Sequence, residues 1–306
     1  MAPTLKQLRY LAELEKLRNF SRAAEVCCVT QSTLSGGIRD LEEMLGVGLF
    51  ERTRRKVIPT PVGSQLADRA RRILAETDGF VEVAKSHVAP YKGSLRLGVI
   101  PTIGPFLLPR IVPAIRTTFP ELKLILREDQ TARLLAQLSA GTLDAVILAF
   151  PCDAPEVDRF IFLDDPFWFA APAGHPISDL KQVSLGDAPL DELLLLEDGH
   201  CLRDHALSAC KLEAAPKGED IIGTSLYTLL QMVSGGLGVT LVPQMALGTD
   251  ILRGMDLVYR PMSADAPSRQ IGFAWRRTSG NKKVLKDLGA MLSDTLKSAA
   301  PPPRKP

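Results

Sequence analysis

Strand-like and helix-like segments alternate along the second part of the chain, and this alternation constrains the fold more than any other feature. SLRLGVI at residues 94–100 has the pattern of a buried strand, and a helical pattern follows it at 107–119. Strands joined through helices tend to pair in parallel with right-handed crossovers, so we predict an α/β domain with a parallel sheet. Further strands are predicted at 122–128, 143–150, 167–173, 193–197, 239–243 and 270–276, and further helices at 131–140, 226–236 and 283–296.

The first part of the chain is predicted to be helical. One amphipathic helix ends near Arg18, a short one follows a predicted cap at Ser21, and Thr30 is predicted to cap a third. The third helix has an apolar face of Leu34, Ile38, Leu41 and Leu45, and an opposite polar face of Gln31, Ser32, Thr33, Ser35 and Arg39. Two helices joined by a tight turn, the second opening with short polar side chains, are typical of a DNA-binding helix-turn-helix. An ordinary helical bundle with a polar surface fits this stretch alone equally well.

A basic cluster follows these helices. Arg52, Arg54, Arg55 and Lys56 stand within five positions, just before a short β-prone run. A solvated run of charge is the usual interpretation of such a cluster. Directly after a helix-turn-helix, however, it indicates a wing that reaches DNA phosphates or the minor groove.

A single long helix is predicted to follow the wing. Thr60 and Pro61 form a cap followed by proline at the first helical position. An apolar stripe then recurs at alternating spacings of four and three, formed by Leu66, Ala70, Ile73, Thr77, Phe80, Ala84 and Val88. A helix with such a stripe tends to pair with a second copy, which predicts a homodimer. Packing of the stripe on its own domain is the alternative.

The segment EDGHCLRDHALSACKL, residues 197–212, carries the candidate chemistry. His200 and Arg203 flank Cys201 and are expected to favour its thiolate, the reactive form of cysteine. A helix over 202–210 would hold Cys201 and Cys210 about 13 Å apart, whereas a disulfide needs Cα atoms about 4.4 to 6.8 Å apart. A bond between them would therefore unwind the helix, which is the geometry of a redox switch.

Two other interpretations of this segment stay open. Unpaired cysteines are usually inert, buried and hydrophobic in character. Alternatively, the imidazoles and thiols of the segment could bind a metal ion, although their spacing matches no common zinc pattern. The four side chains concerned are His200, Cys201, His205 and Cys210.

Composition narrows the class of protein. The chain has 306 residues with a formal net charge of +2, and charged residues interrupt every apolar run near its start. No apolar stretch approaches the length of a membrane span, so we expect a cytoplasmic protein without a membrane anchor. Its five cysteines, an odd number, argue against a structural disulfide framework in the reducing cytoplasm. No cofactor or resident metal is predicted.

The run FSRAAEVCCVTQSTLSGGIRDLEEMLGVGLFERTRRKVIPTPVG, residues 20–63, resembles the winged helix-turn-helix of LysR-type transcriptional regulators. The resemblance implies a DNA-binding domain at 1–60, a linker helix for dimerisation at 61–89 and a periplasmic-binding-protein-like effector domain at 90–306. That domain would have one subdomain at 90–163 and 269–300 and a second at 164–268. The implied partners are promoter DNA, RNA polymerase and further copies of the chain, as a homodimer or homotetramer. The implied DNA-facing residues are Gln31, Ser32, Thr33, Ser35, Arg39, Arg52 and Arg54.

A narrower resemblance covers nearly the whole chain. LLLLEDGHCLRDHALSAC, VIPTIGPFLLP, QTARLLAQL and GTSLYTLLQMVSGGLGVTLVP are similar to the hydrogen-peroxide-sensing members of that family. This similarity implies a peroxidatic thiol at Cys201 and a resolving thiol at Cys210, in an activator of oxidative-stress genes that a cellular dithiol reductant resets. The groups that would shape the peroxide site are Thr102, Thr131, His200, Arg203 and Asp204. Thr102 and Thr131 follow predicted strands, at the sheet edge where ligands bind, although both hydroxyls could instead be plain helix caps. A LysR-type regulator of a small organic effector and a thiol peroxidase enzyme are the alternatives.

Overall fold

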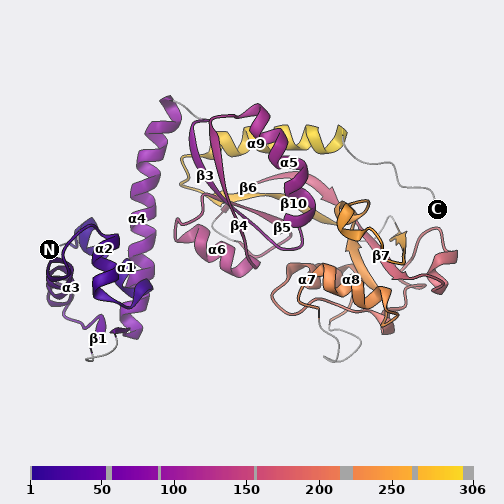
Figure 1. Ribbon diagram of the computed structural model, residues 1–306, viewed down its shortest axis with the longest axis horizontal. Helices are drawn as coiled ribbons and strands as arrows, with labels where there is room; N and C mark the ends of the chain where they lie inside the picture. Colours follow the sequence, from indigo (N-terminus) through magenta and orange to yellow (C-terminus); the bar gives the residue numbers. More distant parts are fainter. Residues whose placement is uncertain are drawn as a thin grey trace. The chain divides into compact units, whose positions relative to one another are not determined.

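The computed structural model describes residues 2–52, 57–88, 91–154, 157–213, 223–263 and 268–298 (Figure 1). The chain forms two compact units, each built around its own buried apolar side chains. The first unit contains Met1–Val88 with the short stretches Gln137–Thr142 and Thr278–Gly280, and the second contains the rest.

Three helices open the first unit, and each is fixed by a side-chain cap. The helices are α1 (Leu5–Leu17), α2 (Phe20–Val26) and α3 (Gln31–Leu45). The Thr30 hydroxyl accepts a hydrogen bond from the Thr33 N–H, which confirms the predicted start of α3. The predicted cap at Ser21 is wrong, because the Asn19 side chain accepts from the Arg22 N–H and α2 begins at Phe20, two residues earlier than predicted. Leu34, Ile38 and Leu41 on α3 are fully buried, as the predicted apolar face requires.

A two-stranded wing follows α3. Strands β1 (Phe50–Arg52) and β2 (Val57–Pro59) pair antiparallel, with Phe50 opposite Pro59. Three of the four basic residues of the predicted wing, Arg54 to Lys56, lie outside the described residues. The Thr60 hydroxyl then accepts from the Gly63 N–H at 3.0 Å and starts α4 (Pro61–Val88), which confirms the predicted long helix.

The apolar stripe of α4 divides into two parts. Ala67 and Ala70 are buried in the core of the first unit, so the first turns of α4 pack on their own domain. Further along, Ile73 is 47% exposed and Phe80 is 80% exposed in the single chain. The buried first turns of α4 therefore fit packing on the same domain, and the exposed part of the stripe fits pairing with a second copy.

The second unit contains a five-stranded mixed sheet in the order β4-β3-β5-β10-β6. Its strands are β3 (Gly93–Val99), β4 (Leu122–Glu128), β5 (Ala145–Phe150), β6 (Val157–Asp165) and β10 (Arg269–Arg276). The first three pair in parallel, as predicted, but β10 runs antiparallel to both β5 and β6. The prediction of a wholly parallel sheet is therefore wrong, because a strand from the far end of the chain inserts between β5 and β6.

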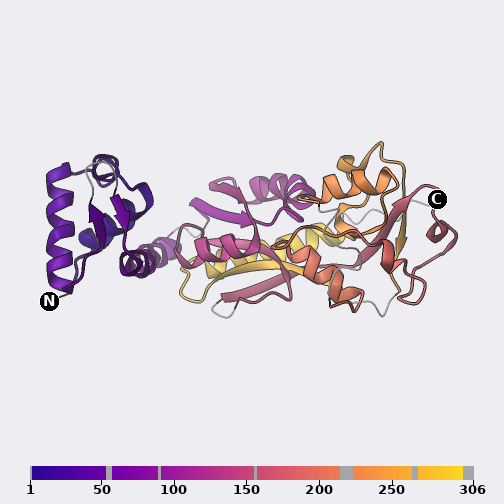
Figure 2. The same ribbon diagram turned by 90° about the horizontal axis from the view of Figure 1, so that it is seen from below.

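Helices cover both faces of this sheet. Helix α9 (Lys282–Ser298) packs on β6 and β10, and α5 (Gly104–Thr118) packs against α9. Helix α6 (Thr131–Ser139) lies on the opposite face (Figures 1 and 2). Both faces are therefore shielded, which is consistent with the complete burial of β5.

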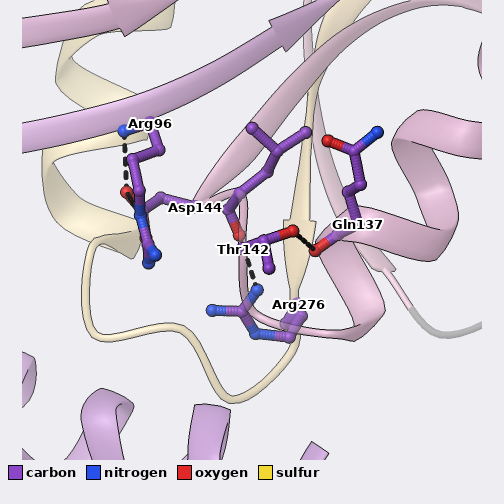
Figure 3. A network of polar contacts seen from close by, with 6 residues as sticks. Arg96, Gln137, Thr142, Asp144 and Arg276 are labelled. Carbon is purple, nitrogen blue, oxygen red and sulfur yellow. Dashed lines mark hydrogen bonds and ion pairs between the residues drawn. The ribbon is translucent and has the colours of Figure 1, made fainter. Parts of the chain in front are cut away.

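A buried carboxylate fixes the start of β5. Asp144 accepts hydrogen bonds from the backbone N–H, Nε and one terminal nitrogen of Arg96 on β3. Arg276 at the end of β10 donates to the Leu143 carbonyl at 2.8 Å (Figure 3). These contacts tie three neighbouring strands together at the edge where β3 and β5 begin.

A second sheet of the same unit has the order β8-β7-β9 and is antiparallel. Its strands are β7 (Phe167–Pro172), β8 (Thr240–Pro243) and β9 (Leu257–Pro261). Helix α8 (Leu226–Ser234) packs on β7 and β8. The strand predicted at 193–197 is wrong, because that segment makes only isolated bridges, from Leu193 to Val239 and from Leu196 to Gly223. Helix α7 (Cys201–Ala209) follows it, and short 3₁₀ turns lie at Pro176–Asp179, Leu190–Glu192, Gln244–Ala246 and Asp250–Leu252.

Candidate functional site

Cys201 is the first residue of α7 and lies partly buried at its N-terminus. Gly199, two residues earlier, has φ of +92°, a conformation that favours glycine and turns the chain into the helix. The N-terminus of a helix carries unsatisfied N–H groups and a partial positive charge. The local sequence therefore places this thiol where negative charge is favoured.

Two threonine hydroxyls from the carboxyl ends of parallel strands meet at this thiol. Thr131 opens α6 after β4, and Thr102 follows β3 and is buried. Both hydroxyls act on the Cys201 thiol and lower its pKa. The strand-end positions predicted for these two residues are the ones that the structure brings together.

A buried ion pair lies beside the thiol, and the sequence analysis did not identify it. Arg269 Nε lies 2.9 Å from Asp165 Oδ2, and both side chains are fully buried. Arg269 also donates to the Thr102 hydroxyl at 3.3 Å and to the Thr102 carbonyl at 3.1 Å. Asp165 accepts from the Met245 N–H at 2.8 Å. An arginine at the start of a mostly apolar strand was the only sign of this pair in the sequence.

Opposing effects set the pKa of the Cys201 thiol. Burial raises this pKa above its usual value, whereas the Arg269 guanidinium and the Thr131 and Thr102 hydroxyls lower it, and Asp204 raises it. Burial dominates, so the net direction is upward. The prediction of a lowered pKa is therefore wrong for this reduced state, and the cation that acts on the thiol is Arg269.

The two cations predicted from the sequence make other contacts. Arg203 Nε pairs with Asp198 at 2.8 Å, and its terminal nitrogen donates to the Leu196 carbonyl at 3.1 Å. His200 is buried, and its Nε2 lies 3.6 Å from a carboxylate oxygen of Glu197. Both side chains thus brace the turn that leads into α7.

Cys210 lies at the opposite end of the same helix. It directly follows the last residue of α7, it is buried, and burial raises its thiol pKa to about 11. All five cysteines are free thiols. Nine residues at about 1.5 Å each separate the two ends by roughly 13 Å, so this structure represents the reduced arrangement.

No group of three or more potential metal ligands comes together among the residues that the structure describes. Within the same part of the chain, none of the helices has the length and apolar character needed to span a lipid bilayer.

The helix-turn-helix presents a polar surface at the start of α3. The side chains of Gln31, Ser32, Thr33 and Arg39 are exposed, and Ser35 is half-buried. The Thr30 hydroxyl bonds to those of Ser32 and Thr33, and Ser21 donates to the Gln31 side chain at 3.0 Å. The Arg52 side chain and the whole of Arg54 lie outside the described residues, so their predicted DNA contacts stay predictions.

The chain combines a winged helix-turn-helix, a long helix with a partly exposed apolar stripe, and an α/β unit with a thiol at a helix N-terminus. This combination defines a class of protein, the DNA-binding regulators with a separate sensory unit. Residues 5–64 match the model of bacterial regulatory helix-turn-helix proteins of the lysR family, and residues 89–297 match the LysR substrate binding domain.

The chain is 43% identical over 272 residues to the DNA-binding transcriptional dual regulator OxyR of Escherichia coli K12, which covers 89% of each chain. A full-length OxyR variant from Pseudomonas aeruginosa superposes with a TM-score of 0.76 at 34% identity, covering 97% of this chain and 98% of that one. A peroxide-bound OxyR variant from Corynebacterium glutamicum gives a TM-score of 0.67 at 32% identity, covering 98% and 94%. The chain therefore belongs to the LysR family of transcriptional regulators, and within it to the OxyR group.

Proposed function

We propose that this regulator senses hydrogen peroxide by oxidation of Cys201 and records the signal as a disulfide with Cys210. The observation that carries the proposal is the convergence of two threonine hydroxyls and a buried arginine on the thiol that begins α7. A site with hydrogen-bond donors and a fixed positive charge suits a thiolate that attacks a small polar oxidant.

In the first step, the Thr102 and Thr131 hydroxyls hold peroxide beside the sulfur. The Cys201 thiolate attacks one peroxide oxygen, the O–O bond breaks, and the products are a sulfenic acid and hydroxide. Arg269 favours the thiolate and holds Thr102 in place through two hydrogen bonds. His200 and Arg203 complete the site by bracing the turn into α7. Asp204 belongs to it through its charge, which acts on the Cys201 thiol.

In the second step, the Cys210 thiol condenses with the sulfenic acid, which forms the disulfide and releases water. Because α7 separates the two residues, this bond requires the helix to unwind. Unwinding would repack the surroundings of α7 and alter subunit contacts, and so change the spacing of the DNA-reading helices. A cellular dithiol would reduce the bond and restore α7.

In this proposal, the regulator binds promoter DNA through α3 and the wing. We propose a homodimer that pairs through the exposed part of the α4 stripe, with assembly to a homotetramer and contact with RNA polymerase. The same proposal divides the chain at residues 60 and 89 into a DNA-binding domain, a linker helix and an effector domain. Within the effector domain, the subdomain boundaries lie near residues 163 and 269. The exposed Ile73 and Phe80 side chains support the dimer, because a second copy would cover them.

The direct test is an equimolar pulse of peroxide on the purified full-length protein, followed by alkylation and mass spectrometry. A disulfide between Cys201 and Cys210 within seconds is the expected result. Slow and non-selective oxidation of all five thiols would contradict the proposal and leave a LysR-type regulator that answers to another ligand.

Oxidation of Cys201 is expected to accelerate by about tenfold per pH unit between pH 6 and 8, because the thiolate is the reactive form. Burial raises the pKa of the thiol, so the thiolate fraction is small throughout this range and grows in proportion to hydroxide concentration. Quenched-flow mass spectrometry of Cys201 measures the rate, with the exposed Cys28 in the same samples as an internal comparison. A plateau at neutral pH would show that the folded protein stabilises the thiolate instead.

Replacement Arg39→Gln is expected to weaken DNA binding and to lower the slope of log affinity against log salt by about 1, because one exposed cation on α3 is lost. The measurement is fluorescence anisotropy with a duplex obtained by in vitro selection, at several salt concentrations. Lys286→Gln on α9 removes the same charge from the second unit and is the matched control. Equal slopes for the two variants would argue against a phosphate contact by Arg39.

A further inference from the structure

A third thiol lies at the same edge of the sheet as the sensing site. Cys152 comes two residues after the end of β5, just as Thr102 follows β3 and Thr131 follows β4. These three strands are parallel neighbours in the order β4-β3-β5, so their carboxyl ends meet at one edge. Opposite β5, Gln270 of β10 pairs with Phe150, which places Arg269 at the level of the residues that follow β5.

A hydrogen bond ties this segment to α7. His205 Nε2 lies 2.8 Å from the Pro151 carbonyl, and because a carbonyl only accepts, that nitrogen carries the proton. His205 and Cys201 are four residues apart and therefore share one face of the helix. The chain immediately before Cys152 thus contacts the face of α7 that bears the sensing thiol.

The electrostatics agree with this placement. The pKa of the Cys152 thiol is raised to about 11, chiefly by burial and next by the charge of Cys201. The Cys201 thiol therefore lies within electrostatic range of Cys152, in agreement with the contact between Pro151 and His205. Cys210, in contrast, lies at the far end of α7.

We propose that Cys152 is a second resolving thiol, which captures the sulfenic acid of Cys201 while α7 is still folded. This inference rests on the proposed oxidation of Cys201 by peroxide. The Cys152 thiol attacks the Cys201 sulfur, the S–O bond breaks, and a Cys152–Cys201 disulfide and water are formed. Cys210 can then displace Cys152 by thiol–disulfide exchange once α7 unwinds, which returns the Cys152 thiol.

Such a bond has a distinct consequence for the sensor. A sulfenic acid that waits for a helix to unwind is exposed to a second peroxide, which would convert it to the irreversible sulfinic acid. Capture by a neighbouring thiol closes that route without the conformational change that signals. The Cys152–Cys201 bond is therefore a protective intermediate that precedes the signalling disulfide.

The test uses the full-length Cys210→Ser variant, treated with equimolar hydrogen peroxide in the presence of dimedone, which labels sulfenic acids. Mass spectrometry is expected to find a Cys152–Cys201 disulfide and little dimedone adduct on Cys201. Adding Cys152→Ser is expected to replace the disulfide with an adduct on Cys201 in most of the protein. Adding Cys28→Ser instead, which removes an exposed thiol of the first unit, is the matched control and should retain the disulfide. Circular dichroism checks that each variant folds.

Equal adduct on Cys201 in Cys210→Ser with and without Cys152 would overturn the second resolving thiol and leave the proposed peroxide oxidation intact. Absence of any adduct or disulfide at Cys201 in all folded variants would overturn both. As an independent measurement, wild-type protein quenched at successive times should show the Cys152–Cys201 bond before the Cys201–Cys210 bond. Appearance of the latter without the former would also contradict the proposed order.

Discussion

Replacement Cys201→Ser is expected to abolish the response to peroxide. A serine hydroxyl occupies nearly the same space at the start of α7, but it forms neither a sulfenic acid nor a disulfide. The variant should therefore bind DNA as the reduced wild-type protein does, with or without peroxide. DNase footprinting on an in vitro selected duplex, before and after a peroxide pulse, measures this directly.

The matched control is Cys27→Ser, a partly buried thiol of the first unit, which should retain the full peroxide-dependent change of footprint. A retained response in Cys201→Ser would assign the signal to another group and would favour a regulator of a small organic effector with inert cysteines.

The second large effect is expected from Arg269→Met, which leaves Asp165 buried without its partner. Removal of one member of a buried ion pair costs about 3–5 kcal/mol, because the remaining charge keeps its desolvation penalty. For a unit of this size, that loss corresponds to a fall in Tm of about 6–20 °C. Differential scanning calorimetry of the reduced protein measures it.

An exposed pair provides the comparison for this prediction. Arg253 lies 2.9 Å from Asp250, and both side chains are more than three-quarters exposed, so Arg253→Met should change stability by less than about 1 kcal/mol. Arg269→Lys keeps a charge near Asp165 and should lose less stability than the methionine variant. Equal Tm values for the Arg269 and Arg253 variants would show that the buried pair does not stabilise the fold.

Arg269→Met should also slow the oxidation of Cys201 in any protein that remains folded. Two contacts are lost together, the charge that lowers the thiol pKa and the hydrogen bonds that position Thr102. Arg253→Met should leave the oxidation rate unchanged. The comparison separates the loss of the buried Arg269 from the loss of an exposed arginine of the same unit.

Local chemistry made much of this protein predictable from its sequence. Thr30 and Thr60 mark the starts of α3 and α4 because a hydroxyl cap acts within three residues, and the apolar face of α3 follows from helical periodicity. The same reasoning placed Thr102 and Thr131 at strand ends and Cys201 beside a helix start. The predicted strand at 193–197 failed because a short apolar run has no periodicity that separates a strand from a buried irregular segment.

Long-range pairing, by contrast, decided the environment of the thiol. Arg269 and Thr102 are 167 residues apart and meet only because β10 inserts antiparallel between β5 and β6, and no local pattern encodes that register. The parallel pairing of β3 with β5 likewise brings the segment that contains Cys152 to the same edge of the sheet. The sequence by itself determined the class of protein, the DNA-reading helix and the candidate redox thiols. The tertiary structure decided which cation acts on the Cys201 thiol and how far burial raises its pKa, because charge and burial depend on distances that only the folded chain defines.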